Sequence, residues 1–295
     1  MLKGVLFVGL GAISYGVLAT VVKLSYNEGF NTEEVTFSQF GIGWLILAVM
    51  AIVQLRNQTA VCDKELTVKH KQAIFKLILA GTSLGFTGLF YYRAVHFVPV
   101  SLCIVLLMQS VWMGVLLEVI LLRKRPSITK IIAVGIVLVG TVFATEVYKD
   151  INVLDFRGVI WGMLGALAYT VSLFTSNKIG LELHNIFRSF WMMTGGFLVV
   201  VFAALPVLFQ SFSWDVFLPW GLFLAIFGTV LPPLFMNKGM PLTGMGIGAI
   251  IIAIEIPVSV AMASIFLQEH INWIQWCGVV LIMCAIVLLN LKKKA

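Results

Sequence analysis

Long apolar runs follow one another along almost the whole chain, and they limit its fold more than any motif does. Each run has about 17–25 residues, the length of a helix that crosses a hydrocarbon layer of roughly 30 Å. The runs cover 4–24, 35–55, 74–92, 100–122, 128–145, 158–177, 187–209, 216–236, 242–267 and 273–291. We therefore predict an all-α integral membrane protein with ten transmembrane helices.

The composition agrees with a membrane protein. Apolar residues make up 60% of the chain and charged residues 11%, whereas roughly 25% of residues are charged in an ordinary soluble domain. The net charge of +7 does not indicate a nucleic-acid partner, because the basic residues stand at the ends of apolar runs. The four cysteines form no CxxC pair and have no nearby histidine at ligand spacing. We expect no disulfide framework, no metal site and no cofactor.

The positions of Lys and Arg predict the orientation. If the N-terminus is cytoplasmic, all but four of the 20 basic residues fall on the cytoplasmic side, the exceptions being Lys23, Arg93, Lys149 and Arg157. An excess of Lys and Arg in short loops marks that side. We expect a multi-pass protein of the cytoplasmic (inner) membrane, embedded in the lipid bilayer, with both termini in the cytoplasm. The sequence leaves both a monomer and a homodimer open.

The ten runs divide into two related sets of five. A shift of 154 residues aligns positions 3–17 with 157–171 and gives seven identities in 15 positions. The identical pairs are Gly4/Gly158, Val5/Val159, Leu10/Leu164, Gly11/Gly165, Ala12/Ala166, Tyr15/Tyr169 and Val17/Val171. Because five is an odd number of spans, the second set must run with the opposite polarity. We expect repeats at 1–146 and 157–295, inverted relative to each other around a central cavity, a common plan of secondary transporters.

A single carboxylate interrupts the run 242–267. Glu255 is its only charged residue and stands near its centre, two residues before Pro257. An ionised acid at the centre of a membrane helix costs roughly 2.5–3.5 kcal/mol, so such residues face a bundle interior or a wet cavity. Pro257 cannot donate its N–H and crowds the carbonyl of Ala253, which predicts a helix break beside the acid. Glu255 is our first candidate for substrate binding and proton coupling; the alternative is a protonated residue that bonds two helices together.

Several segments carry a family resemblance. They are GAISYG at 11–16, GALAYT at 165–170, YYRAVHFVPVSL at 91–102, the segment 237–260 around Glu255, LQE at 267–269 and IQWCGVVLIMCA at 274–285. In order and spacing, both halves resemble the EamA domain of the drug/metabolite transporter superfamily. The first half departs from the second, with Trp112 and Lys124 where the second has Pro257 and Glu269. The resemblance implies ten helices around a central cavity that carries small polar metabolites, often amino acids and often outward.

Polar residues inside the runs are candidates for lining such a cavity. Tyr15 and Tyr169 correspond in the two repeats and stand midway along their runs, and Gln109 adjoins Ser110, the counterpart of Glu255. Buried Tyr hydroxyls need partners and can bind a ligand. Further candidates are Ser14, Gln39, Trp161, Ser172 and Asn237. For each of these residues, an ordinary bond between helices or an interfacial aromatic is the competing interpretation.

Charged residues near the ends of the runs are candidates for a gate or entrance. Lys23 and Arg93 approach the outer face, where they either guide a carboxylate, snorkel to lipid headgroups or pair with Glu28 and Glu33. Lys238 falls at the predicted cytoplasmic turn before 242 and is either a gate residue or an orienting charge.

Function follows from these features as a hypothesis. The chain has no Gly-x-Ser-x-Gly elbow, no His-Glu-x-x-His motif and no Walker glycine loop, so neither an enzyme nor an ATP-driven pump is indicated. We expect a secondary-active exporter of an amino acid or related small metabolite that works by alternating access. Two alternatives stay open: an importer of a cationic or nucleoside-like metabolite, and a non-transporting assembly or sensor subunit.

Overall fold

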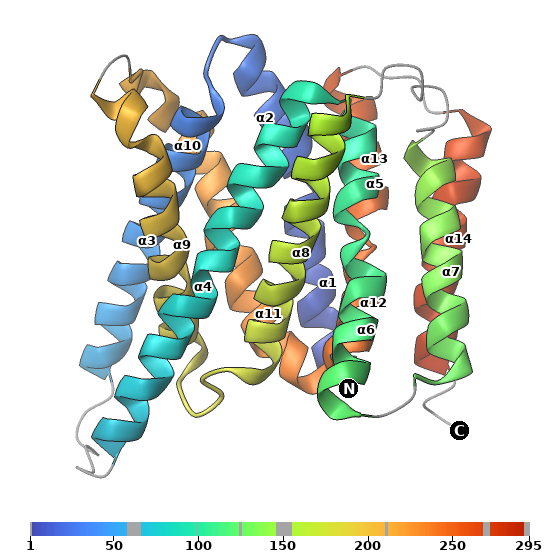
Figure 1. Ribbon diagram of the computed structural model, residues 1–295, viewed down its shortest axis with the longest axis horizontal. Helices are drawn as coiled ribbons and strands as arrows, with labels where there is room; N and C mark the ends of the chain where they lie inside the picture. Colours follow the sequence, from blue (N-terminus) through green and yellow to red (C-terminus); the bar gives the residue numbers. More distant parts are fainter. Residues whose placement is uncertain are drawn as a thin grey trace.

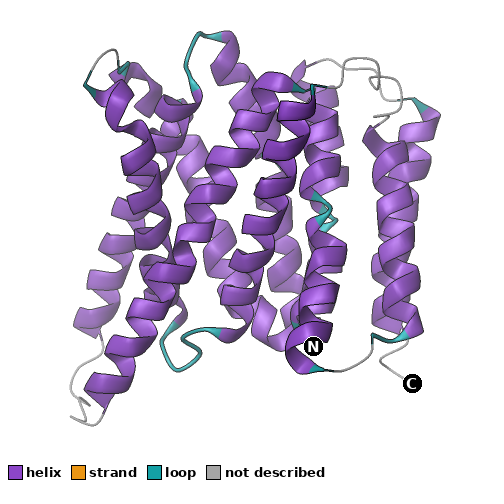
Figure 2. Cartoon of the chain, in the orientation of Figure 1, coloured by secondary structure: helices purple, strands orange, loops and turns teal. Residues whose placement is uncertain are grey.

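The structure is a computed structural model that describes residues 2–57, 66–98, 100–123, 126–145, 155–209, 212–267 and 272–291. Within these ranges every regular element is a helix (Figures 1 and 2). The elements are α1 Leu2–Gly16, α2 Leu18–Asn27, α3 Thr32–Asn57, α4 Leu66–Phe97, α5 Val100–Leu107, α6 Ser110–Leu122, α7 Ile128–Thr145, α8 Phe156–Lys178, α9 Asn185–Leu208, the 3₁₀-helix η3 Trp214–Phe217, α10 Trp220–Leu224, the π-helix η4 Ala225–Val230, α11 Leu231–Thr243, α12 Met245–Ile252, α13 Glu255–Leu267 and α14 Trp273–Leu291.

Eight helical segments of the described ranges are long and apolar enough to cross a membrane. They are Leu2–Asn27, Thr32–Arg56, Lys71–Phe97, Leu102–Leu121, Phe156–Lys178, Asn185–Leu208, Trp214–Thr243 and Met245–Phe266. Two further apolar helices, Ile128–Ala144 and Trp273–Ile286, are shorter. The helices run roughly side by side, and α1 begins and α14 ends at the same end of the bundle, which we call the terminal end (Figure 1). The protein is therefore a multi-pass membrane protein.

Helix ends differ most from the predicted runs where the chain leaves the apolar layer. Helix α4 has 32 residues, a length of about 48 Å, because its charged first turns extend beyond the apolar run. Helix α11 continues to Thr243 and ends at Gly244, whose φ of 79° suits a residue without a side chain. Lys238 therefore lies inside α11 and not in a turn, which corrects the sequence prediction.

Several spans are interrupted in the middle. Helices α5 and α6 are separated at Met108 and Gln109, and α12 and α13 at Ala253 and Ile254. Figure 2 shows such an interruption as a short teal segment halfway along the bundle. Pro257 has no N–H to donate to the Ala253 carbonyl. At this second break the same carbonyl accepts from the Ile256 N–H at 3.1 Å, so it still has a partner. Both breaks lie beside the buried centre of the molecule.

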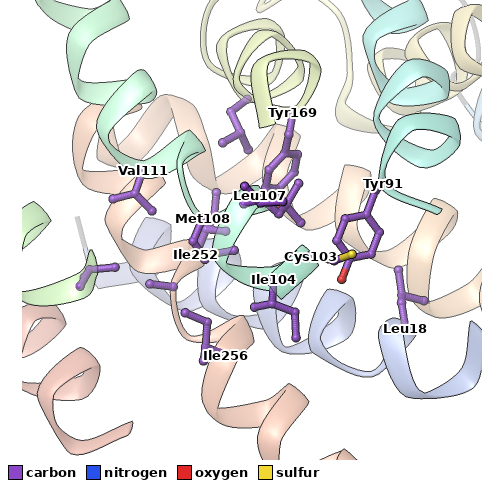
Figure 3. Packing of buried hydrophobic residues seen from close by; sticks show 14 of the residues in the cluster. Leu18, Tyr91, Cys103, Ile104, Leu107, Met108, Val111, Tyr169, Ile252 and Ile256 are labelled. Atoms are coloured by element: carbon purple, nitrogen blue, oxygen red, sulfur yellow. The ribbon is translucent and has the colours of Figure 1, made fainter. Parts of the chain in front are cut away.

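Close helix contacts depend on glycines within the chain. A Cβ at Gly81 of α4 would meet the Met192 carbonyl of α9, and a Cβ at Gly85 would meet the Gly196 carbonyl. These two helices therefore touch backbone to backbone, as small residues allow in membranes. The main apolar cluster lies around α5 and α12, and Figure 3 shows Leu107, Met108 and Ile252 within it.

Candidate functional site

A partly enclosed cavity lies within the bundle, and residues from both halves of the chain line it. Its volume is about 70 Å³. The lining residues are Tyr15, Leu18, Ala19, Gln39, Phe40, Leu84, Thr87, Gly88, Tyr91, Tyr92, Ile104, Leu107, Tyr169, Met193, Gly228, Thr229, Glu255 and Ser259. The cavity thus brings together four sequence candidates, Tyr15, Gln39, Tyr169 and Glu255, from four different helices.

Glu255 is the acid of this cavity. It is the first residue of α13, directly after the helix break, and only 8% of its surface is exposed. Its Oε2 atom is buried and has no hydrogen-bond partner among the described residues. A polar atom in this position carries a desolvation cost unless it meets a proton, a solute or water. The break places this atom at a cavity wall and not against lipid.

The two repeat-related tyrosines meet in the middle of the bundle. The rings of Tyr15 in α1 and Tyr169 in α8 make an edge-to-face contact, with centroids 5.8 Å apart and ring planes at 81°. Both rings also line a second, smaller cavity of about 10 Å³, together with Ser172 and Ser176. The Tyr169 hydroxyl is buried and has no partner among the described residues. The tyrosine pair therefore separates two voids, and one of its hydroxyls is free to bind.

Two further tyrosines of the cavity were not among the sequence candidates. Tyr91 and Tyr92 follow each other in α4, and the Tyr92 hydroxyl donates to Gln39 Oε1 at 2.8 Å. Figure 3 shows the Tyr91 side chain near Cys103 and Leu18. Both tyrosines stand in the segment 91–102 that carried the family resemblance. A signal was therefore present, but apolar periodicity does not say which face of such a helix turns inward.

Four other sequence candidates do not line this cavity, and each makes hydrogen bonds within the protein, although the buried Oδ1 of Asn237 has no partner among the described residues. Gln109 bonds within its own span, to the Val105 carbonyl at 3.0 Å and to Trp112 at 2.8 Å. Ser14 donates to the Phe227 carbonyl at 2.6 Å. Asn237 donates to Ser189 Oγ at 2.9 Å. Ser172, in the smaller cavity, donates to the Tyr169 carbonyl at 2.8 Å.

The gate candidates do not line the cavity either. Arg93 pairs with Glu33 at 3.1 Å and lies 5.5 Å from the Trp161 ring centroid, beside a separate surface hollow of about 310 Å³. Trp161 therefore belongs to this hollow, which lies opposite the terminal end. Lys238 lies 4.4 Å from the ring centroid of Phe7, and Lys23 is half-buried in α2.

A buried arginine near the terminal end was missed by sequence reasoning. Arg188 of α9 is 3% exposed and donates to the carbonyls of Ile179 at 3.1 Å, Asn237 at 2.5 Å and Ser176 at 2.7 Å. It thus joins the end of α8 to α11. The sequence showed only a basic residue at the start of an apolar run, which is also typical of an orienting charge.

Comparison with known proteins fits this geometry. The model of the EamA-like transporter family matches residues 2–145 and 156–291. The chain belongs to the EamA-like transporter family. It is thus a member of the drug/metabolite transporter superfamily.

Individual similarities extend over the full length. An uncharacterized transporter from Synechocystis sp. is 25% identical over 317 aligned residues, which cover 99% of this chain and 94% of the relative. A solved crystal structure superposes with a TM-score of 0.77 over 99% of each chain at 13% identity, which shows likeness of fold alone. Transport is the activity associated with EamA-like proteins, which agrees with a protein that is not an enzyme.

Proposed function

We propose that this EamA-like protein is a secondary-active transporter that exports a small polar metabolite, an amino acid or a related solute, across the cytoplasmic membrane by alternating access. The observation that carries the proposal is the mid-bundle cavity in which the unpartnered Oε2 of Glu255 adjoins a helix break. Discontinuous helices and intramembrane acids are both typical of solute sites in transporters.

Ten spans in two inverted repeats are part of this proposal. Helices α7 and α14 have 18 and 19 residues, or about 27 and 28 Å, close to the thickness of the hydrocarbon layer. Helix contacts are reciprocal between the halves. Helix α1 packs on α11, and its counterpart α8 packs on α4, the counterpart of α11. In the same way, α1 packs on α12 and α13, and α8 packs on their counterparts α5 and α6. Helices α3 and α9, which correspond to each other in the two halves, also pack together, and so do the corresponding helices α7 and α14. This pattern supports a two-fold relation that exchanges residues 1–146 with 157–295.

Coupling to protons is the second part. Burial disfavours the charged form of a carboxylate, and Glu255 has only neutral groups around it in the cavity lining. A proton on Glu255 therefore changes the charge of the whole cavity. We propose that proton binding and release at this residue accompany the movement of solute.

Flux into proteoliposomes tests both parts. Uptake of a labelled amino-acid mixture is compared with and without a pH gradient, for wild type and for Glu255→Gln, with protein-free liposomes as the background. We expect uptake above background in wild type, increased by the gradient, and loss of the gradient effect in the variant. Equal uptake in all four cases would reject proton coupling, and uptake at background throughout would contradict transport of amino acids.

Import of a cationic metabolite is the second candidate function. The cavity lining contains one acid and no Lys, Arg or His among the residues described, which favours a cation or zwitterion over an anion. Counterflow measured from each side of the membrane separates import from export.

A further inference from the structure

We infer that the cavity recognises its solute through an ammonium group, so that its ligands are small organic amines and a carboxylate on the solute is not required. This inference rests on the proposed function, because it assigns a ligand class to the same cavity. Three features carry it: the charge of the lining, the aromatic walls, and the contacts that basic residues outside the cavity already make.

The charge of the lining favours a cation. Glu255 is the acid among the described lining residues, and its buried Oε2 lacks a partner. An ammonium group would supply both a counter-charge and a hydrogen-bond donor, which removes the cost of an unpaired buried oxygen. When Glu255 is ionised, a solute carboxylate in the same cavity would meet it with no basic side chain of the described lining between them, and like charges at short range are costly.

Three basic side chains outside the cavity are already engaged. Arg93 pairs with Glu33 beside the separate hollow. Lys238 lies over the Phe7 ring, and all three polar contacts of Arg188 are to backbone carbonyls. Recruiting any of them for a solute carboxylate would first break these interactions. The described lining of the cavity therefore offers the solute a counter-ion for its amine and none for an acid.

The walls suit the rest of an amine. Tyr15, Tyr91, Tyr92 and Tyr169 border the cavity together with Phe40, and aromatic faces attract organic cations. The unpartnered Tyr169 hydroxyl can accept a hydrogen bond from an ammonium N–H. Leucine, isoleucine and methionine side chains add apolar surface to the lining, which also contains Gln39 and the hydroxyl groups of Thr87, Thr229 and Ser259. Because the cavity is small, at about 70 Å³, we choose a short branched aliphatic amine as the probe.

Three probes that differ only in their charged groups test this inference. Isobutylamine carries the ammonium alone, valine carries both groups, and isovalerate carries the carboxylate alone. Binding to purified full-length protein is measured by thermal shift and calorimetry at pH 8, where an alkyl amine stays protonated. The proteins are wild type, Glu255→Gln, and the matched control Glu182→Gln, which removes an exposed acid between α8 and α9.

We expect isobutylamine to bind wild type and the Glu182→Gln control alike, and to bind Glu255→Gln at least tenfold more weakly. Isovalerate should not bind, and valine should bind no tighter than isobutylamine. The inference is overturned if isovalerate binds, if valine binds tenfold tighter than isobutylamine, if the Glu255 substitution leaves amine affinity unchanged, or if no probe binds.

Failure of this inference and failure of the proposed function give different results. Uptake of amino acids in proteoliposomes without any amine binding overturns the ammonium assignment and leaves transport in place. Amine binding that depends on Glu255, in a protein that moves neither amino acids nor the permanently charged probe tetramethylammonium, supports the site and contradicts transport.

Discussion

At the scale of single residues, two buried tyrosine hydroxyls of the same cavity should respond differently to removal. Tyr92 donates to Gln39 Oε1, so Tyr92→Phe leaves a buried acceptor unpaired and should cost about 1–3 kcal/mol of stability. The Tyr169 hydroxyl has no partner among the described residues, so Tyr169→Phe should leave the melting temperature unchanged or higher. Thermal unfolding in detergent measures both variants. Equal destabilisation of the two would mean that the Tyr169 hydroxyl has an internal partner.

Isobutylamine binding should respond in the opposite way, with Tyr169→Phe weakening it more than Tyr92→Phe does. If the free hydroxyl of Tyr169 binds the ammonium group, Tyr169→Phe lowers affinity about fivefold, or about 1 kcal/mol. Calorimetry on the folded variants checks this expectation. Unchanged affinity would exclude the hydroxyl from the site.

Arg188 makes a further prediction at this scale. Replacement by Leu leaves the carbonyls of Ser176, Ile179 and Asn237 without this donor and should cost about 3 kcal/mol. Arg157 is the matched control, since its ion pair with Asp155 lies at the surface and surface pairs contribute little. Thermal unfolding of Arg188→Leu and Arg157→Gln should therefore give a large and a small shift. Two similar shifts would show that Arg188 has no special role in stability.

Among helices, the contact between α4 and α9 should be the most sensitive to added volume. A Cβ at Gly195 of α9 would overlap the Ile78 carbonyl of α4, and backbone on both sides cannot move aside as a side chain can. We expect Gly195→Ala to cost about 3 kcal/mol or more. At Gly135 of α7 nothing lies within 4 Å of an added Cβ, so Gly135→Ala should be neutral or slightly stabilising. Melting temperatures of the two variants check the prediction, and a neutral Gly195→Ala would contradict the close packing.

Helix positions could be predicted far better than helix faces. The apolar runs 128–145 and 273–291 coincide with α7 and α14. The rotation of each helix about its axis was not predictable, because a helix that is apolar all round has no polar stripe to mark its inner side. Glu255, Tyr15 and Tyr169 were found because their residue type or their repeat position is unusual. Tyr91 and Tyr92 were not, and Gln109 was placed in the cavity although its amide bonds within its own span.

For the whole molecule, the orientation in the membrane is open to a direct test. Glu182 and Asp215 are exposed residues before and after α9, at opposite ends of the bundle. In a variant whose native cysteines have been replaced, Asp215→Cys should react with a membrane-impermeant maleimide in intact cells. Glu182→Cys should react only after the cells are opened, because the positive-inside rule puts that end in the cytoplasm. The reverse pattern would invert the proposed orientation.

The breaks between α5 and α6 and between α12 and α13 have a mechanical consequence. A continuous helix behaves as a stiff rod, so a tilt imposed at one surface is felt at the other. At these two breaks hydrogen bonds of the tighter i→i+3 type appear, from Gln109 to Leu106 and from Ile254 to Ile251, so we expect each span to bend more easily there than a regular helix does. The segments α6 and α12 are in contact where Gly114 approaches Ala249, so we expect bending at the breaks to move α5 and α13 relative to this contact. In the proposed alternating-access cycle, such bending would let one surface open while the other stays closed.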